Sequence, residues 1–111
     1  MKNRSRKTQL SAEVHIHTND GVFLTPRRIR LLEAIDKYGS ITKAAKRLSM
    51  SYKTAWDSVH EMNCCSNKKL VISDKNIGSH LTDTGRFTLN MYYGIEKACN
   101  YGVMHMNERI G

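Results

Sequence analysis

The sequence has no hydrophobic run of the length that membrane proteins carry. No stretch approaches about 18 apolar residues, the length that a membrane-spanning helix needs. The basic start MKNRSRK is followed by polar TQLSAE, where a secretory signal peptide would have an apolar segment. We therefore expect a cytoplasmic protein without a membrane segment.

Cysteine is scarce, with three residues in the chain. An odd number without regular spacing does not suit a disulfide framework, so we expect reduced thiols. Cys64 and Cys65 are neighbours, whereas paired zinc ligands usually have a two-residue gap. His15, His17 and the run Met104-His105-Met106 also match no recognised ligand spacing, and we predict neither a metal site nor a cofactor.

Motifs of common catalytic sites are also missing. The sequence contains no nucleophile elbow, phosphate-binding loop or zinc-protease helix. Asp83-Thr84-Gly85 matches the triplet of aspartic proteases, in which two subunits would supply a carboxylate pair. That chemistry needs a loop buried among strands, whereas this triplet opens an apolar helical stripe. We therefore do not expect an enzyme.

Positive charge is in excess. Eighteen Lys and Arg face ten Asp and Glu, which gives a net charge of +8 over 111 residues. This balance favours a polyanionic partner, either nucleic acid or an anionic membrane surface. The start of the chain is basic without apolar partners, so we expect residues 1–12 to form a flexible arm.

The rest of the chain predicts small β-hairpins and helices. Residues 13–25 alternate apolar and polar side chains around the turn residues Asn19-Asp20-Gly21, which predicts a hairpin. Thr25-Pro26 is a helix start that Gly39 ends, and Ser40 caps a second helix over residues 41–48. The buried stripes of these two helices are expected to contain Ile29, Leu31, Leu32, Ile35, Ile41, Ala44, Ala45 and Leu48.

After Ser49-Met50, Ser51 caps a third helix over residues 52–63, with Ala55, Val59 and Met62 on one inward stripe. Residues 70–81 predict a second hairpin. Thr82 caps a last helix whose apolar residues recur every three or four positions. That stripe could serve dimerisation or ordinary packing onto the same core, and it contains Phe87, Met91, Ile95, Cys99 or Ala98, Gly102 and Met106.

Two close helices followed by a hairpin are the winged helix-turn-helix arrangement. Small Ala44 and Ala45 allow the second helix to pack across the third, which then lies in the DNA major groove. The predicted fold class is mainly α with small β-hairpins. We divide the chain into the arm 1–12, a winged helix-turn-helix DNA-binding domain 13–82 and a C-terminal dimerisation helix 83–111.

Residues 27–63, RRIRLLEAIDKYGSITKAAKRLSMSYKTAWDSVHEMN, resemble the N-terminal DNA-binding domain of the ModE family of molybdate-responsive transcriptional regulators, and more distantly the LysR-type domain. The SYKTAWDSVHEMN stretch is the most specific part. The chain departs from the family at Ser49, where a glycine is common, and in a wing that holds only Gly78. Family members continue into molybdate-binding domains, whereas this sequence stops at Gly111, so we expect no molybdate sensing by that route.

The resemblance implies DNA contacts at the start of the third helix. Hydroxyl and lysine side chains contact bases or phosphates, and the implied group is Ser51, Tyr52, Lys53 and Thr54. Trp56 either reaches the groove edge or fills a half-buried seam. Candidate phosphate contacts, which could equally be solvated, are Arg27, Arg28, Thr42, Lys43, Lys46 and wing residue Lys75.

The family also implies dimers, which fit palindromic sites. We expect a homodimer formed through Phe87, Met91, Ile95, Cys99 and Gly102. The expected function is that of a sequence-specific, ModE-like regulator of transcription that binds double-stranded DNA and has no molybdate-binding domains. The alternative is a winged-helix module that contacts an acidic protein. The sequence identifies no effector.

Overall fold

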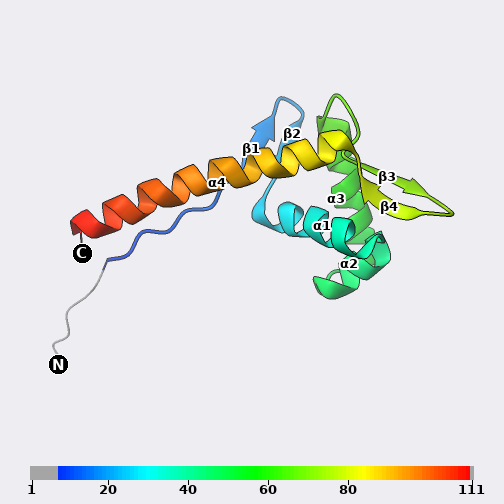
Figure 1. The fold of residues 1–111 in the computed structure, drawn as a ribbon, viewed down its shortest axis with the longest axis horizontal. Coiled ribbons are helices and arrows are strands. Elements are labelled where there is room, and N and C mark those ends of the chain that lie inside the picture. The colour runs from blue at the N-terminus through cyan, green and yellow to red at the C-terminus, as the bar shows by residue number, and fades with distance from the viewer. Residues whose placement is uncertain (1–7, 111) are drawn as a thin grey trace.

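The computed structural model describes residues 8–110 of the chain. It is mainly helical, with two separate two-stranded antiparallel sheets (Figure 1). The elements in order are β1 (Ile16–Thr18), β2 (Gly21–Leu24), α1 (Pro26–Tyr38), α2 (Ile41–Arg47), α3 (Tyr52–Cys65), β3 (Val71–Asp74), β4 (Gly78–Leu81) and α4 (Asp83–Ile110). The predicted fold class, a winged helix-turn-helix with a long C-terminal helix, is confirmed.

The helix starts follow from local sequence. Thr25, Ser40, Ser51 and Thr82 each accept a hydrogen bond from the backbone N–H three residues later, at 3.0 to 3.2 Å. Such caps typically stabilise a protein by about 1 kcal/mol each. Gly39 ends α1 with a φ of 67°, which favours glycine. All four predicted caps and the predicted stop are therefore confirmed.

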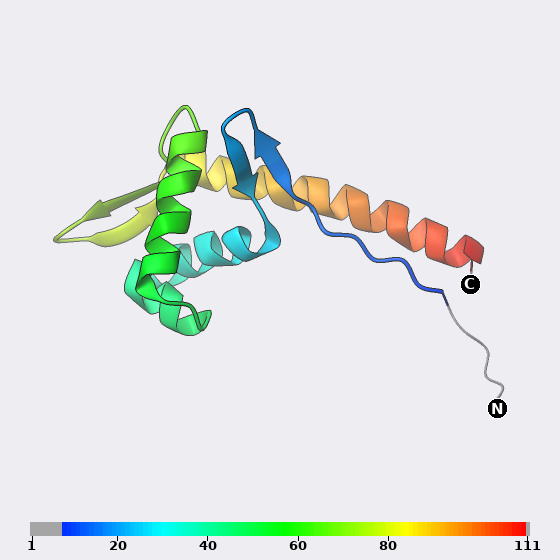
Figure 2. The same cartoon turned by 180° about the vertical axis from the view of Figure 1, so that it is seen from behind.

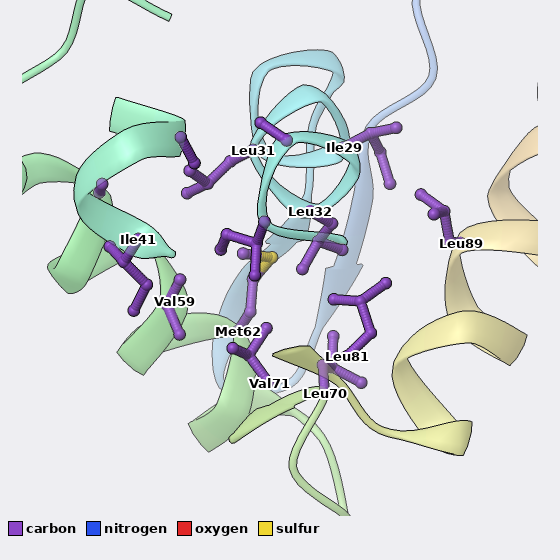
Figure 3. Packing of buried hydrophobic residues seen from close by; sticks show 14 of the residues in the cluster. Ile29, Leu31, Leu32, Ile41, Val59, Met62, Leu70, Val71, Leu81 and Leu89 are labelled. Carbon is purple, nitrogen blue, oxygen red and sulfur yellow. The ribbon is translucent and has the colours of Figure 1, made fainter. Parts of the chain in front are cut away.

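The core lies where α1, α2 and α3 meet the second hairpin (Figure 3). Leu32 and Ile35 of α1, Met62 of α3, and Leu70 and Leu81 beside the wing are fully buried. The predicted inward residues of all three helices belong to this cluster or pack against it. Gly85 of α4 lies so close that a Cβ atom there would be 2.2 Å from the Leu70 carbonyl oxygen. This contact fixes where α4 leaves the core.

The wing formed by β3 and β4 is tied to the rest of the domain at its base. The Ser79 N–H donates to the Gly39 carbonyl oxygen at 3.0 Å. A Cβ atom on Gly78 would lie 2.4 Å from the same oxygen, so this close approach requires glycine. The wing is thus fixed against the turn between α1 and α2.

The turn between α2 and α3 contains a strained residue. Ser49 has a φ of 54°, in the left-handed region that non-glycine residues rarely adopt. The Ser49 and Met50 N–H groups donate to the carbonyl oxygens of Lys46 and Ala45, at 3.2 and 3.0 Å. These bonds close the last turn of α2 and set the direction of α3.

The last helix extends well beyond the core. Its buried residues are Gly85, Thr88, Leu89 and Tyr92, all in its first half. Figures 1 and 2 both show an N-terminal segment running beside the second half of α4. None of the helices in residues 8–110 is long and apolar enough to cross a membrane.

Two sets of hydrogen bonds hold the N-terminal segment. The Leu10 N–H donates to Asn107 Oδ1 at 2.8 Å, and Asn107 Nδ2 donates back to the Leu10 carbonyl oxygen at 3.2 Å. The Tyr92 hydroxyl donates to the Val14 carbonyl oxygen at 2.9 Å. Residues 8–12 of the expected arm therefore lie along α4, while residues 1–7 fall outside the described part of the chain.

Candidate nucleic-acid interface

The start of α3 is exposed and polar, whereas one side of the helix is buried in the core. Ala55, Val59 and Met62 hold one side of the helix in the core. The cap and first turn of the helix carry the four residues implied for DNA contact, and all of them are exposed: Ser51, Tyr52, Lys53 and Thr54. Tyr52 is 53% exposed, which makes its ring available to a partner. The structure therefore brings these four candidates together at one helix end.

Lys53 forms an ion pair on this surface. Its Nζ donates to Asp57 Oδ2 at 2.8 Å, one turn later in α3. This hydrogen bond, together with the nearby negative charge, raises the pKa of Lys53 above its ordinary value. Lys53 is therefore fully charged at neutral pH, and Asp57 holds its side chain beside the helix.

Trp56 is exposed, with one face of its ring covered. Its indole is 46% exposed and stacks on the His60 ring, with centroids 5.1 Å apart and planes 7° from parallel. Cys64 Sγ lies 3.7 Å from His60 Nε2, so Trp56, His60 and Cys64 form one row of side chains along three consecutive turns of α3. Trp56 thus combines a fixed orientation with an accessible face.

The two adjacent arginines of α1 have different environments. Arg27 is exposed, whereas the Arg28 side chain is only 14% exposed. Arg28 Nη1 donates to the carbonyl oxygens of Val22 at 2.7 Å and Phe23 at 3.2 Å, and Nη2 bonds Glu61. Arg28 therefore joins the first hairpin, α1 and α3, and its guanidinium is already occupied.

The remaining basic candidates are on the surface. Thr42, Lys43 and Lys46 are exposed on α2, and Lys75 is exposed at the tip of the wing. The tip is ordered by Asp74 Oδ1, which accepts the N–H groups of Asn76 at 2.7 Å and Ile77 at 3.3 Å. Lys75 is therefore presented from a defined turn.

The residues expected to form a dimer lie on an uncovered face of α4. Phe87, Met91 and Ile95 are 70%, 36% and 41% exposed, Cys99 is half-buried and Gly102 is exposed. They follow one another at three- or four-residue steps, so they form a continuous stripe. Within residues 8–110, no other segment buries this stripe.

The structure also places the residues behind two alternatives from the sequence analysis, an aspartic protease and a metal site. Asp83-Thr84-Gly85 forms the first turn of α4, not a loop among strands. His15 lies 3.4 Å from Glu13, on the exposed side of the first hairpin. In the part of the chain that the structure describes, no three His, Cys, Asp or Glu side chains are placed to hold a metal ion.

Some residues near this surface were missed by the sequence analysis. Lys69, Ile72 and Ser73 line a groove with Trp56 and His60, between α3 and β3. The Lys68-Lys69 pair before an apolar strand was the available signal. The structural roles of Arg28 and Asn63 carried no such signal, because they depend on contacts between distant segments.

Named relatives share the sequence of this region. "Molybdenum transport protein ModE" of Azotobacter vinelandii is 37% identical over 107 residues, covering 93% of this chain and 40% of that protein. "DNA-binding transcriptional dual regulator ModE" of Escherichia coli K12 is 50% identical over 50 residues, covering 45% of this chain and 19% of its own length. The chain thus spans well under half the length of these relatives.

Solved structures share the fold. The "CbnR_DBD-DNA complex" has a TM-score of 0.62 at 19% identity, covering 75% of this chain and 94% of that chain. The "BenM_DBD/benA site 1 DNA Complex" has a TM-score of 0.61 at 19% identity, covering 79% and 100%. At this identity, the similarity concerns the fold alone.

The family match covers the winged helix-turn-helix. Residues 26–86 match the family described as "Bacterial regulatory helix-turn-helix protein, lysR family". They begin at the first residue of α1 and end in the first turn of α4. The ModE resemblance of residues 27–63 is confirmed by the named relatives. The chain therefore belongs to the lysR family of bacterial regulatory helix-turn-helix proteins, with a ModE-type helix-turn-helix region.

Proposed function

We propose that this chain is a sequence-specific regulator of transcription that binds double-stranded DNA. The observation that carries the proposal concerns α3: its capped first turn is exposed, while its inward side chains hold the helix against the core. In winged helix-turn-helix proteins this end of the helix enters the major groove. Residues 52–57 would then lie in the major groove, while the net charge of +8 supplies attraction to phosphates.

The proposal includes a homodimer. The apolar stripe of α4 through Phe87, Met91 and Ile95 is exposed in the single chain, and burying it against a second copy would remove it from water. A two-fold dimer would present two α3 helices to an inverted repeat. DNA contact by exposed Arg27, Lys43 and Lys75 would add affinity without selecting sequence.

The remaining parts follow from that role. A protein that regulates transcription in bacteria acts in the cytoplasm, where the chromosome lies. Binding and release of DNA require no catalytic group, so we propose a binding protein and not an enzyme. Names of relatives that include "transcriptional regulator" support this role for the shared region.

Selection of bound duplexes from a random pool, at near-physiological salt, tests the proposal. An enriched inverted repeat is expected, with half-sites separated by about 10 base pairs or a multiple of that distance. Enrichment of one half-site alone would support reading by α3 and reject the dimer. A folded protein that enriches no sequence would overturn the proposal and favour the protein-interaction alternative.

A further inference from the structure

His60 and Cys64 form a side-chain pair on the outer face of α3. They are four residues apart, so they lie one above the other on successive turns of the helix. Cys64 Sγ is 3.7 Å from His60 Nε2, and both side chains are exposed. In the sequence, the nearest cysteine to Cys64 is at a spacing that zinc sites do not use. The structure instead brings its thiol to a histidine one turn earlier.

Cys65 does not share this contact. Its thiol donates to the Val22 carbonyl oxygen of the first hairpin at 3.9 Å, and its side chain is partly buried. Adjacent residues of a helix point in directions about 100° apart, so the two thiols have different neighbours. His60 and Cys64, and not the two cysteines, are therefore the pair that can share one ligand.

The orientation of His60 is set by its other neighbour. Its ring stacks on Trp56, with centroids 5.1 Å apart and planes 7° from parallel. This stack restricts rotation of the imidazole while Nε2 lies beside Cys64. A side chain that is already held in place loses less conformational entropy when it takes a ligand. Trp56 is also the single tryptophan of the chain, so its fluorescence reports on this histidine alone.

The distance between the two ligand atoms indicates the kind of metal ion that suits the pair. Zinc bonds to Cys sulfur at about 2.3 Å and to His nitrogen at about 2.05 Å, which places these atoms about 3.6 Å apart at a tetrahedral angle. A right angle, as in square-planar copper, needs about 3.1 Å, and a linear arrangement needs about 4.4 Å. The observed 3.7 Å between Cys64 Sγ and His60 Nε2 fits the tetrahedral angle.

The surroundings supply negative charge beside Cys64. The groove of about 370 Å³ that Cys64 lines also contains Asp20 and Glu61, together with Arg28. The Arg28 guanidinium is already bonded to Glu61 and to two carbonyl oxygens. Within residues 8–110, no third His, Cys, Asp or Glu is placed to complete a set of ligands. The pair therefore supplies two protein ligands and leaves the remaining positions to water.

We propose that His60 and Cys64 form a binding site for a tetrahedral divalent metal ion of the zinc class. His60 binds as the neutral imidazole through Nε2, with its proton on Nδ1, and Cys64 binds as the thiolate after its proton passes to solvent. Two waters complete the coordination. Both ligands lie in the second half of α3, so the first turn stays exposed when the metal is bound. The inference goes beyond the proposed DNA-binding function and does not depend on it.

Cobalt(II) is the probe, because it takes the same ligands as zinc and is coloured. A tetrahedral cobalt ion with a thiolate ligand gives a visible ligand-field band and a near-ultraviolet charge-transfer band, and it quenches a nearby tryptophan. The full, untagged and reduced chain is titrated with Co²⁺, and Zn²⁺ is then added. His60→Phe keeps an aromatic ring beside Trp56, and Cys64→Ser keeps a small polar side chain, while each removes one ligand. Cys65→Ser and His17→Gln are the matched controls, since each removes the same kind of group elsewhere.

We expect one Co²⁺ per chain, with both bands and with quenching of Trp56, and we expect Zn²⁺ to displace it. His60→Phe and Cys64→Ser should each weaken binding by more than about 100-fold, because even the partners of metal ligands contribute about 10- to 100-fold. The charge-transfer band should be absent from Cys64→Ser at every cobalt concentration. Cys65→Ser and His17→Gln should bind cobalt as the unaltered protein does.

Four results would overturn the inference. A charge-transfer band that persists in Cys64→Ser would assign the metal to another cysteine, and an equal loss of affinity in Cys65→Ser would indicate a dithiol site. One Co²⁺ per two chains would indicate a metal that joins two molecules. Absence of the bands and of quenching in the unaltered, folded protein would show that the pair binds no metal. A duplex selection that enriches no sequence would instead reject the proposed function and leave the metal site standing.

Discussion

Asn63 and Val71 bond each other in both directions: Asn63 Oδ1 accepts the Val71 N–H at 3.2 Å, and Asn63 Nδ2 donates to the Val71 carbonyl oxygen at 3.0 Å. Such a pairing usually joins two strands, yet here a helix side chain replaces one of them. It attaches β3 to α3, so the wing and α3 keep one relative position.

Replacing Asn63 with alanine should therefore destabilise the fold. The substitution leaves backbone groups of Leu70 and Val71 without their partner, and an unsatisfied buried group costs about 1–3 kcal/mol. We expect a loss of about 2 kcal/mol in the free energy of unfolding, measured by urea titration. Asn67→Ala, at an exposed loop position, is the control and should change little. Equal losses of unfolding free energy in the two variants would contradict a stabilising role for the Asn63 hydrogen bonds.

Arg28 and Arg27 should respond differently to alanine. Arg28→Ala removes bonds to two carbonyl oxygens and to Glu61, and we expect a loss of about 2 kcal/mol in stability. Arg27→Ala should keep stability within about 0.5 kcal/mol, because its side chain is exposed, while reducing DNA affinity. Thermal denaturation and DNA titration of both variants measure this. Unchanged stability in Arg28→Ala would contradict the structural role.

Glycine at position 49 should stabilise the protein. Ser49 has a φ of 54°, which costs a residue with a side chain about 1 kcal/mol or more, whereas glycine adopts it freely. After the greater flexibility of glycine in the unfolded chain is subtracted, we expect a gain of about 0.5 kcal/mol. Ser66→Gly, where φ is −111°, should instead destabilise. A loss of stability at both positions would contradict the conclusion that the backbone of Ser49 is strained.

A charge in the apolar stripe of α4 should prevent dimerisation. Ile95→Glu would bury two unpaired carboxylates between the helices, so the dissociation constant of the dimer should rise by about 100-fold or more. Ile95 is 41% exposed in the single chain, so the fold itself should survive. Sedimentation equilibrium gives the result, with Lys97→Glu on the polar side of α4 as the control. A dimer that persists in Ile95→Glu would place the interface elsewhere.

Tyr93 should make the fold sensitive to alkali. Burial, and then its hydrogen bond to Glu33, raise the pKa of Tyr93 above its ordinary value. The neutral form is favoured in the folded state, so this stability is present below about pH 10 and is lost as the pH rises further. The side chain is 36% exposed, so water screens part of the effect.

Tyr93→Phe should therefore lose less stability than the unaltered protein between neutral and strongly alkaline pH. Denaturation midpoints across that range measure the difference. Tyr101→Phe changes a 61% exposed ring on the same helix and should follow the unaltered protein. A parallel pH profile in Tyr93→Phe would contradict a role for this hydroxyl.

The features predicted correctly from the sequence are local ones. A hydroxyl cap such as Thr25 acts on an N–H three residues away, and a stripe such as Ala55, Val59 and Met62 depends only on helix periodicity. The first hairpin was also predicted, although its strands begin at Ile16 and not in the first residues of the span 13–25.

The features that were missed link distant parts of the chain. Arg27 and Arg28 are indistinguishable by residue type, and their burial differs because the first hairpin folds back over α1 at one of them. The groove beside α3 likewise requires Asn63 to meet the strand that begins eight residues later, which helix periodicity does not indicate. Such contacts arise from tertiary packing and leave no periodic trace.

The bonds between Leu10 and Asn107 bring together residues that are 97 positions apart, at the end of α4 remote from the wing (Figure 1). The two ends of the described chain therefore lie side by side, at one end of the molecule. A fluorophore attached beside Leu10 and another beside Asn107 would transfer energy efficiently while the two segments stay paired. A reporter fused at this end of α4 would lie away from the α3 surface that we propose to bind DNA, so the same labelled molecule could be followed in a DNA titration.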